Sequence, residues 1–434
     1  MFLLSLLFWA AVVAGALALL GYLNRRYLRA ETSPDAIHFV TTEDGWRLSL
    51  THHHPRAPLP GAPPVVLCAG AGFGSVVFDV TRETSLARYL AEHGHDVWLL
   101  DLRGRGRSPG RRAAWSFDDY VEFDLPAAVG LVLDRSGAEQ VQWIGFGVGA
   151  LVASAALSAG ALSARLRSVV SLAAPVFFRR QQATFRPRLL RSLRLLRIDL
   201  LSALVAPLLG RLFPGPLKLL QNRDNVDGAV YRRALVNGLA RLSRTELNQY
   251  AEWLEHDTFT AMVQRRDYRA AMADITTPTL FIVGPRDELA PVEMVEATAS
   301  LLDSVDDRVL VVASRMHGMS TNYGHLDLLL GRGVQRDIHT HVLRWLDLHA
   351  GVEIPEGRPE PPEPREGWEE PPRRDRTGRG DAARSDDTPR ALPSPEDEQA
   401  ATAPASPADG ADPEPDDDES EEDLVQGDVP RLPG

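Results

Sequence analysis

Residues 143–149 read Trp-Ile-Gly-Phe-Gly-Val-Gly, and this short stretch decides the fold. It lies between an apolar segment at 140–144, which is typical of a strand, and a helical pattern of small residues at 149–161. The glycines at alternate positions leave room for a strand to turn sharply into a helix, because they carry no Cβ. The stretch therefore predicts a turn between a strand and a helix, with glycines at 145, 147 and 149.

Strand-like and helix-like segments alternate on both sides of this turn. Apolar runs that are typical of buried strands lie at 64–69, 96–102, 140–144, 168–172, 279–283 and 309–312. Helical patterns lie at 81–93, 117–135, 149–161 and 335–350. Two further strands, 37–42 and 46–52, surround the turn Glu43-Asp44-Gly45. The alternation predicts the α/β class, with a mostly parallel sheet and helices on both of its faces.

Four segments resemble the α/β-hydrolase superfamily, in the order in which that family carries them. They are SLARYLAEHGHDVWLLDLRGRGRSP at 85–109, WSFDDYVEFDLPAAV at 115–129, PTLFIVGPRDELAP at 278–291 and NYGHLDLLLG at 322–331. The similarity is greatest to bacterial lipase-like and polyhydroxyalkanoate-synthase-like members. It implies an α/β-hydrolase domain over 32–350, with a helical cap inserted at about 176–275 that covers the pocket and selects the substrate.

The resemblance also implies the positions of the catalytic groups. The family carries its nucleophilic serine at the centre of a G-x-S-x-G turn, where this chain has Gly147, which has no group to attack a carbonyl. Asp287 occupies the acid position and His325 the histidine position, with His317 as a nearby rival. The backbone amides of Ala71 and Val148 are implied as the oxyanion donors, a role that depends on no side chain.

Other residues offer weaker alternatives for the missing nucleophile. Cys68 is the only cysteine, but a lone strand cysteine is usually a small buried apolar group. Ser154 and Ser158 are the nearest downstream hydroxyls, yet both fall within the predicted helix. The histidine run 52–54 suggests a metal site only weakly, since at most two of its side chains share a strand face. No cofactor or metal is expected.

The two ends of the chain differ from its centre in composition. Residues 2–24 contain no charge and are followed by Arg25, Arg26 and Arg29. This pattern predicts a single-pass transmembrane anchor over 1–24 with the body in the cytoplasm, and a cleaved signal peptide is the alternative. Residues 351–434 contain 25 Asp and Glu, nine Arg and 16 of the 32 prolines, which predicts a disordered acidic tail.

Charge patterns suggest partners for three parts of the chain. Seven arginines and no acidic residue lie between Arg179 and Arg197, interleaved with leucines at helical spacing. This pattern indicates either a basic amphipathic helix on a membrane surface or a cap helix with its leucines on the core. The acidic tail predicts a basic partner or no specific partner. A nucleic-acid partner is not expected, because the chain has a net charge of −12 and no recognisable binding motif.

Three functions are consistent with these features, and they leave open whether the chain is an enzyme. The first is a membrane-anchored, lipase/esterase-like protein that binds or acts on a hydrophobic ester or lipid, with catalysis impaired at Gly147. The second is an active hydrolase or lyase in which the His325–Asp287 pair works without a serine, on water or directly as a base. The third is a scaffold that binds a partner through its acidic tail.

Overall fold

The computed structural model describes residues 2–108, 110, 114–160, 162–179, 204, 222, 224–263 and 266–363. The chain divides into two units, Met1–Glu369 and Glu370–Gly434, and all described residues belong to the first unit. The predicted acidic tail beyond residue 363 and the Arg-rich stretch from 180 to 197 lie outside the described residues. The scaffold function and the membrane-surface helix therefore stay predictions.

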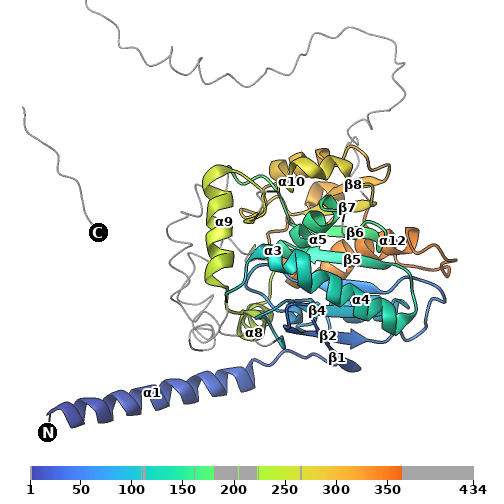
Figure 1. Ribbon diagram of the computed structural model, residues 1–434. Helices are drawn as coiled ribbons and strands as arrows, with labels where there is room; N and C mark the ends of the chain where they lie inside the picture. The colour runs from blue at the N-terminus through green and yellow to red at the C-terminus, as the bar shows by residue number, and fades with distance from the viewer. Residues whose placement is uncertain are drawn as a thin grey trace, which may run out of the picture. The chain divides into compact units, whose positions relative to one another are not determined.

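An eight-stranded sheet forms the centre of the first unit (Figure 1). Its spatial order is β1-β2-β4-β3-β5-β6-β7-β8, and only the β1–β2 and β2–β4 pairs are antiparallel. The structure thus confirms the predicted, mostly parallel sheet. In chain order the strands are β1 (Ala36–Thr41), β2 (Arg47–His53), β3 (Val65–Cys68), β4 (Val97–Asp101), β5 (Val141–Phe146), β6 (Leu166–Leu172), β7 (Thr279–Val283) and β8 (Arg308–Val312).

Helices cover both faces of the sheet, as two neighbouring side chains of β5 show. Successive residues of a strand point to opposite faces. The Gln142 amide donates to the backbone of α12 (Thr340–Leu348) at Leu346, over 2.8 Å. The adjacent Trp143 indole donates to the Gly149 carbonyl of α5 (Val148–Ser158), over 3.0 Å. Helices α5 and α12 therefore lie on opposite faces, and every residue of β5 is buried between the two layers.

The predicted helices form, with shifted ends. The segment at 81–93 becomes helical only at Leu86, because the Ser85 hydroxyl caps the helix by accepting the Arg88 N–H at 3.0 Å. The segment at 117–135 is helical, with a π-helical turn at Tyr120–Asp124. Within the described residues the other α-helices are α2 (Leu86–Glu92), α3 (Phe117–Asp119), α4 (Leu125–Ser136), α8 (Gly228–Gly238), α9 (Arg244–His256), α10 (Val292–Ser300) and α11 (Asp327–Leu330).

The N-terminal segment also forms a helix, α1 (Phe2–Tyr27), with Arg25 and Arg26 in its last turn. Within the part of the chain that the structure describes, however, no helix combines the length and the apolarity that crossing a bilayer requires. The predicted transmembrane anchor, and with it the single-pass membrane location of a cytoplasmic body, is therefore wrong. The prediction rested on the absence of charge and on the many Leu, Ala, Val and Phe residues of this segment. The alanines and glycines between Ala10 and Gly21 carry less apolar area per residue than the leucines and valines around them.

Helices α8 and α9 lie between β6 and β7, in the segment where the cap is predicted. Helix α9 begins with a capping box, in which the Ser243 hydroxyl and the Glu246 carboxylate each accept a backbone N–H of the first turn. The same Ser243 hydroxyl accepts the Trp115 N–H at 2.9 Å. The start of α9 is thus held directly against the loop that precedes α3.

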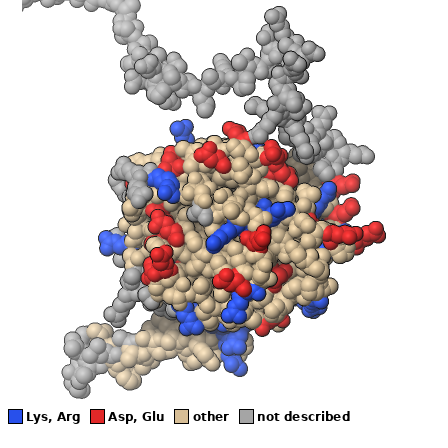
Figure 2. Space-filling model, turned by 45° about the vertical axis from the view of Figure 1, so that its right-hand side comes forward, with Lys and Arg blue, Asp and Glu red and all other residues tan. Residues whose placement is uncertain are grey.

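Charged side chains of both signs are interspersed on the face of the molecule that Figure 2 shows. Among the described residues, oppositely charged side chains form pairs, such as Arg233 with Glu31 at 2.6 Å. The net charge of the whole chain, −12, equals that of Glu370–Gly434, which carries 19 Asp and Glu and seven Arg. The first unit as a whole therefore holds equal numbers of acidic and basic residues.

Candidate active site

The turn between β5 and α5 has the sharp backbone that the sequence predicts. Gly147 has φ +50° and ψ −117°, a backbone conformation that residues other than glycine rarely adopt. A Cβ at Gly145 would lie 2.3 Å from the Ala150 backbone, and one at Gly149 would lie 2.1 Å from the Cys68 carbonyl oxygen. The two flanking glycines are therefore required by close packing of the backbone.

Gly147 differs from its neighbours because the space beside it is open. A Cβ there would lie 3.7 Å from Gly70 Cα and 4.0 Å from His325 Nε2, which are ordinary contact distances. A hydroxyl on that Cβ could approach Nε2 to hydrogen-bonding distance. The position therefore has the room and the direction that a nucleophilic side chain needs, and holds none.

His325 and Asp287 form a hydrogen-bonded pair at the edge of the sheet where β7 and β8 end. Asp287 follows β7, His325 follows β8, and His325 Nδ1 lies 2.7 Å from Asp287 Oδ2. The other carboxylate oxygen accepts the backbone N–H groups of Leu289 at 2.8 Å and Ala290 at 2.7 Å. The buried Asp287 side chain is thereby fixed in place, and it holds the imidazole with Nε2 directed at Gly147.

The alternative residues lie elsewhere. His317 Nδ1 contacts the Ser314 hydroxyl at 2.6 Å, not Asp287. Cys68 is fully buried in β3, and burial raises the pKa of its thiol far above the ordinary range, which disfavours the reactive thiolate. Ser154 and Ser158 donate their hydroxyls to carbonyls of their own helix. None of these four side chains lines the cavity that Gly147 and His325 share.

That cavity has a volume of about 230 Å³ and is bounded mainly by apolar side chains. Gly147, His325, Ala71 and Val148 all line it, so the structure brings four of the five predicted site residues to one surface, while Asp287 lies behind His325. Helix α9 closes one side with Tyr250, Trp253 and Leu254. The other lining residues are Gly70, Phe73, Phe146, Leu151, Ala173, Ala174, Pro175, Phe178 and Leu289.

The loop that carries Ala71 is braced on two sides. Its Gly70 carbonyl accepts a hydrogen bond from Arg105 Nη1 at 3.1 Å. Its Gly72 carbonyl accepts the Ala240 N–H at 2.7 Å, which joins the loop to the segment between α8 and α9. The backbone around Ala71 is therefore fixed by the body of the domain and by the α8–α9 segment.

A buried charged network behind this loop was not predicted from the sequence. Arg105 and Glu246 are 1% and 0% exposed and form a close ion pair. Arg105 also donates to the Tyr120 hydroxyl at 3.0 Å, and the Tyr250 hydroxyl donates to Glu246 at 2.8 Å. Although burial opposes the charged form, Glu246 holds the pKa of Arg105 above its usual value. Arg105 lies in the recognised segment 85–109, but its partner is 141 residues away, so no local pattern marks the pair.

The sheet and the turn after β5 define the class of protein. The chain belongs to the alpha/beta hydrolase fold family, whose model matches residues 63–318, more than half of the chain. It is 33% identical over 151 residues to a tear acid lipase-like protein of Mesocricetus auratus, covering 32% of this chain and 38% of that protein. It is 31% identical over 157 residues to the gastric triacylglycerol lipase of Bos taurus, covering 33% and 40%. The chain thus spans about two fifths of these relatives' length.

Solved structures also match this chain, at lower sequence identity. A thermophilic esterase from Thermogutta terrifontis has a TM-score of 0.49 and 17% identity, over 73% of this chain and 99% of that one. A hydrolase from Pseudomonas aeruginosa PA01 has a TM-score of 0.49 and 20% identity, over 74% and 100%. The family match confirms the predicted superfamily and fold class.

Proposed function

We propose that the protein binds a hydrophobic ester or a lipid-derived acyl ligand in the cavity beside Gly147, and that it has little or no acyl-enzyme chemistry. One observation carries the proposal: a His–Asp pair at 2.7 Å is directed at a position that has room for a side chain and has none. The lipase relatives support an ester or acyl ligand, and the apolar wall of the cavity suits its hydrocarbon chain.

The backbone amides that line the cavity favour a ligand with a carbonyl or carboxylate group. Val148 is the first residue of α5, and backbone N–H groups at a helix start attract negative charge. Ala71 lies on the braced loop across the same cavity. We assign the amides of these two residues to the ligand's polar end, with the hydrocarbon chain directed along Trp253 and Leu254.

The missing hydroxyl has a large kinetic cost. Removing the nucleophile of a working triad typically lowers turnover by about a millionfold. Binding energy and backbone donors survive such a change, so a protein with this site retains ligand affinity while its hydrolysis falls towards the uncatalysed rate.

A second candidate function is slow hydrolysis by a water molecule activated by His325. The observation in its favour is the room beside Gly147 that faces Nε2, where a general base could hold a water against a bound ester. This mechanism depends entirely on the imidazole, so its activity should disappear in His325→Ala.

Ester turnover over a range of acyl chain lengths separates the two functions, with wild type beside His325→Ala and the exposed control His256→Ala. The proposed function predicts no turnover above background in any of the three. A fluorescent fatty acid should nevertheless bind the wild type, and Ala174→Leu, which fills the cavity wall, should weaken its binding at least tenfold. Turnover that His325→Ala alone abolishes would establish the water mechanism. Failure of the fatty acid to bind would contradict the proposed ligand class.

A further inference from the structure

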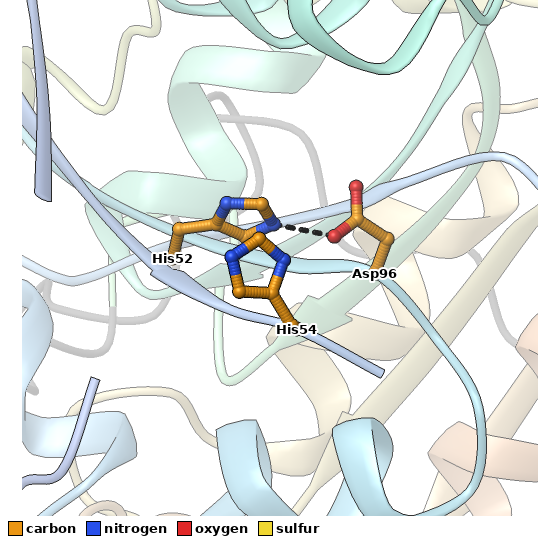
Figure 3. A group of neighbouring side chains, drawn as sticks. All are labelled: His52, His54 and Asp96. Atoms are coloured by element: carbon orange, nitrogen blue, oxygen red, sulfur yellow. Dashed lines mark hydrogen bonds and ion pairs between the residues drawn. The ribbon is translucent and has the colours of Figure 1, made fainter. Parts of the chain in front are cut away.

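Two histidines and an aspartate gather at the edge of the sheet, away from the cavity. His52 is in β2, His54 follows that strand, and Asp96 immediately precedes β4 (Figure 3). One ligand atom from each of the three lies within 4.8 Å of the other two, and His52 Nε2 is 2.5 Å from Asp96 Oδ1. His53 points to the opposite face, where its Nε2 is 3.5 Å from Asp79. The strand alternation thus places two histidines of the run on one face.

We propose that His52, His54 and Asp96 form a binding site for a divalent transition-metal ion of the Zn²⁺ type. Neutral imidazole nitrogens and a carboxylate oxygen are ligands that Zn²⁺ prefers, whereas Mg²⁺ and Ca²⁺ prefer oxygen ligands alone. Three protein ligands would leave one position of a tetrahedral ion to a water molecule, on the side of the exposed His54. The exposed His54 ring lies beside the buried His52 ring, with centroids 4.1 Å apart, and Asp96 is partly buried.

Trp98 contacts two of the proposed ligands and restrains their side chains. Its indole N–H donates to Asp96 Oδ2 at 2.9 Å, which leaves Oδ1 directed at His52. Its ring stacks on the His52 imidazole, with centroids 3.7 Å apart and an interplanar angle of 18°. The backbone N–H of His54 donates to Asp35 at 2.8 Å and so fixes the residue that carries the third ligand. Contacts that orient the ligands in this way typically strengthen a metal site.

The topology separates this site from the cavity. Strands β3, β4 and β5 are parallel, and the cavity lies beyond the carboxyl ends of β3 and β5, at Gly70 and Gly147. Asp96 precedes the amino end of β4, so it lies at the opposite edge of the sheet. Strand β2 is antiparallel to β4, with His52 opposite Trp98 in the register. A bound ion would therefore link the last residues of β2 to the first residue before β4 and stabilise this antiparallel pair.

Calorimetric titration of ZnCl₂ into full-length protein without a histidine tag tests the site. We expect one Zn²⁺ per chain in the wild type, and at least tenfold weaker binding in His54→Ala and in Asp96→Asn. His256→Ala removes an exposed histidine outside the cluster and should bind like the wild type. MgCl₂ should give no binding. Equal Zn²⁺ affinity in wild type and His54→Ala, or no binding to the wild type, would overturn the proposal.

A thermal measurement shows whether the ion acts on the fold. Saturating ZnCl₂ should raise the unfolding temperature of the wild type and leave that of His54→Ala unchanged, because a ligand that binds only the native state stabilises it. His54 is exposed, so the variant should fold, and circular dichroism in the absence of metal checks this. The same Zn²⁺-induced shift in both proteins would place the ion elsewhere and contradict the site.

Discussion

At the scale of single residues, the three glycines around the β5–α5 turn are subject to different constraints. At Gly145 and Gly149 a Cβ would lie within 2.3 Å of backbone atoms, so no larger residue fits there. At Gly147 only the positive φ favours glycine. We expect Gly145→Ala and Gly149→Ala each to lower the free energy of unfolding by at least ~3 kcal/mol, since the backbone must move. Gly147→Ala should cost about 1–2 kcal/mol, from conformational strain alone. Urea unfolding measures all three, and equal losses would contradict this distinction.

His339 makes stability depend on pH. It is fully buried, and burial lowers its pKa from 6.5 to about 3. Below pH 6.5 the unfolded chain binds a proton at this residue and the folded chain does not, so stability is lost as the pH falls. Between pH 7 and pH 5 this group should account for on the order of 2 kcal/mol. The variant His339→Leu should show a correspondingly smaller loss in denaturant titrations at the two pH values, and an unchanged loss would refute the assignment.

At the scale of elements, the Arg105–Glu246 pair joins helix α9 to the loop behind the cavity. Arg105→Leu leaves the fully buried Glu246 without its counter-charge, so we expect a loss of about 3–5 kcal/mol in the free energy of unfolding. Replacing both residues, Arg105→Met with Glu246→Leu, should recover most of that loss, because no buried charge then remains unpaired.

A matched control for that experiment is Arg82, which pairs with Glu92 at 3.6 Å on the surface, with side chains 69% and 37% exposed. Arg82→Ala should change the free energy of unfolding by no more than about 0.5 kcal/mol. A loss in Arg105→Leu no larger than this control would show that the buried network is not a structural support.

The elements differ in how well their sequence predicts them. Strand β7 has the same bounds as the apolar run 279–283 that predicts it. A strand buried on both faces needs an unbroken apolar segment of this kind. The start of α2 was predicted too early, because the Ser85 cap outweighs the apolar pattern before it. The Arg105–Glu246 pair could not be predicted, because its partners come together only in the tertiary fold.

At the scale of the whole molecule, the order of motifs predicted more than composition did. The four segments that resemble the family, in their order along the chain, were sufficient to predict the superfamily and the pairing of Asp287 with His325, because the order of the strands fixes which loops meet. The uncharged, largely apolar composition of residues 2–24 was not sufficient to predict a membrane span. The role of Gly147 stays a proposal, since the family match identifies the fold and not the chemistry at that position.

The separation into two units predicts how the molecule tolerates truncation. Deletion of Glu370–Gly434 removes the whole net charge of −12. We expect the unfolding temperature of the remaining unit to change by less than about 2 °C, which corresponds to roughly 1 kcal/mol in a unit of this size. Solubility near pH 7 should fall, because a protein of zero net charge associates more readily. Thermal scans measure the first effect, and precipitation by polyethylene glycol measures the second. A large drop in unfolding temperature would contradict the expectation that the first unit folds without residues 370–434.

The central claim, that the site is complete except for a nucleophile at Gly147, is tested most directly by ester turnover of Gly147→Ser. The added Cβ would lie 4.0 Å from His325 Nε2, so its hydroxyl can reach the imidazole. The claim predicts that the wild type shows no turnover above background, that Gly147→Ser hydrolyses the ester at least ~100-fold faster than background, and that adding His325→Ala to this variant abolishes the gain. Rapid hydrolysis by the wild type, or a folded Gly147→Ser with no gain, would contradict it.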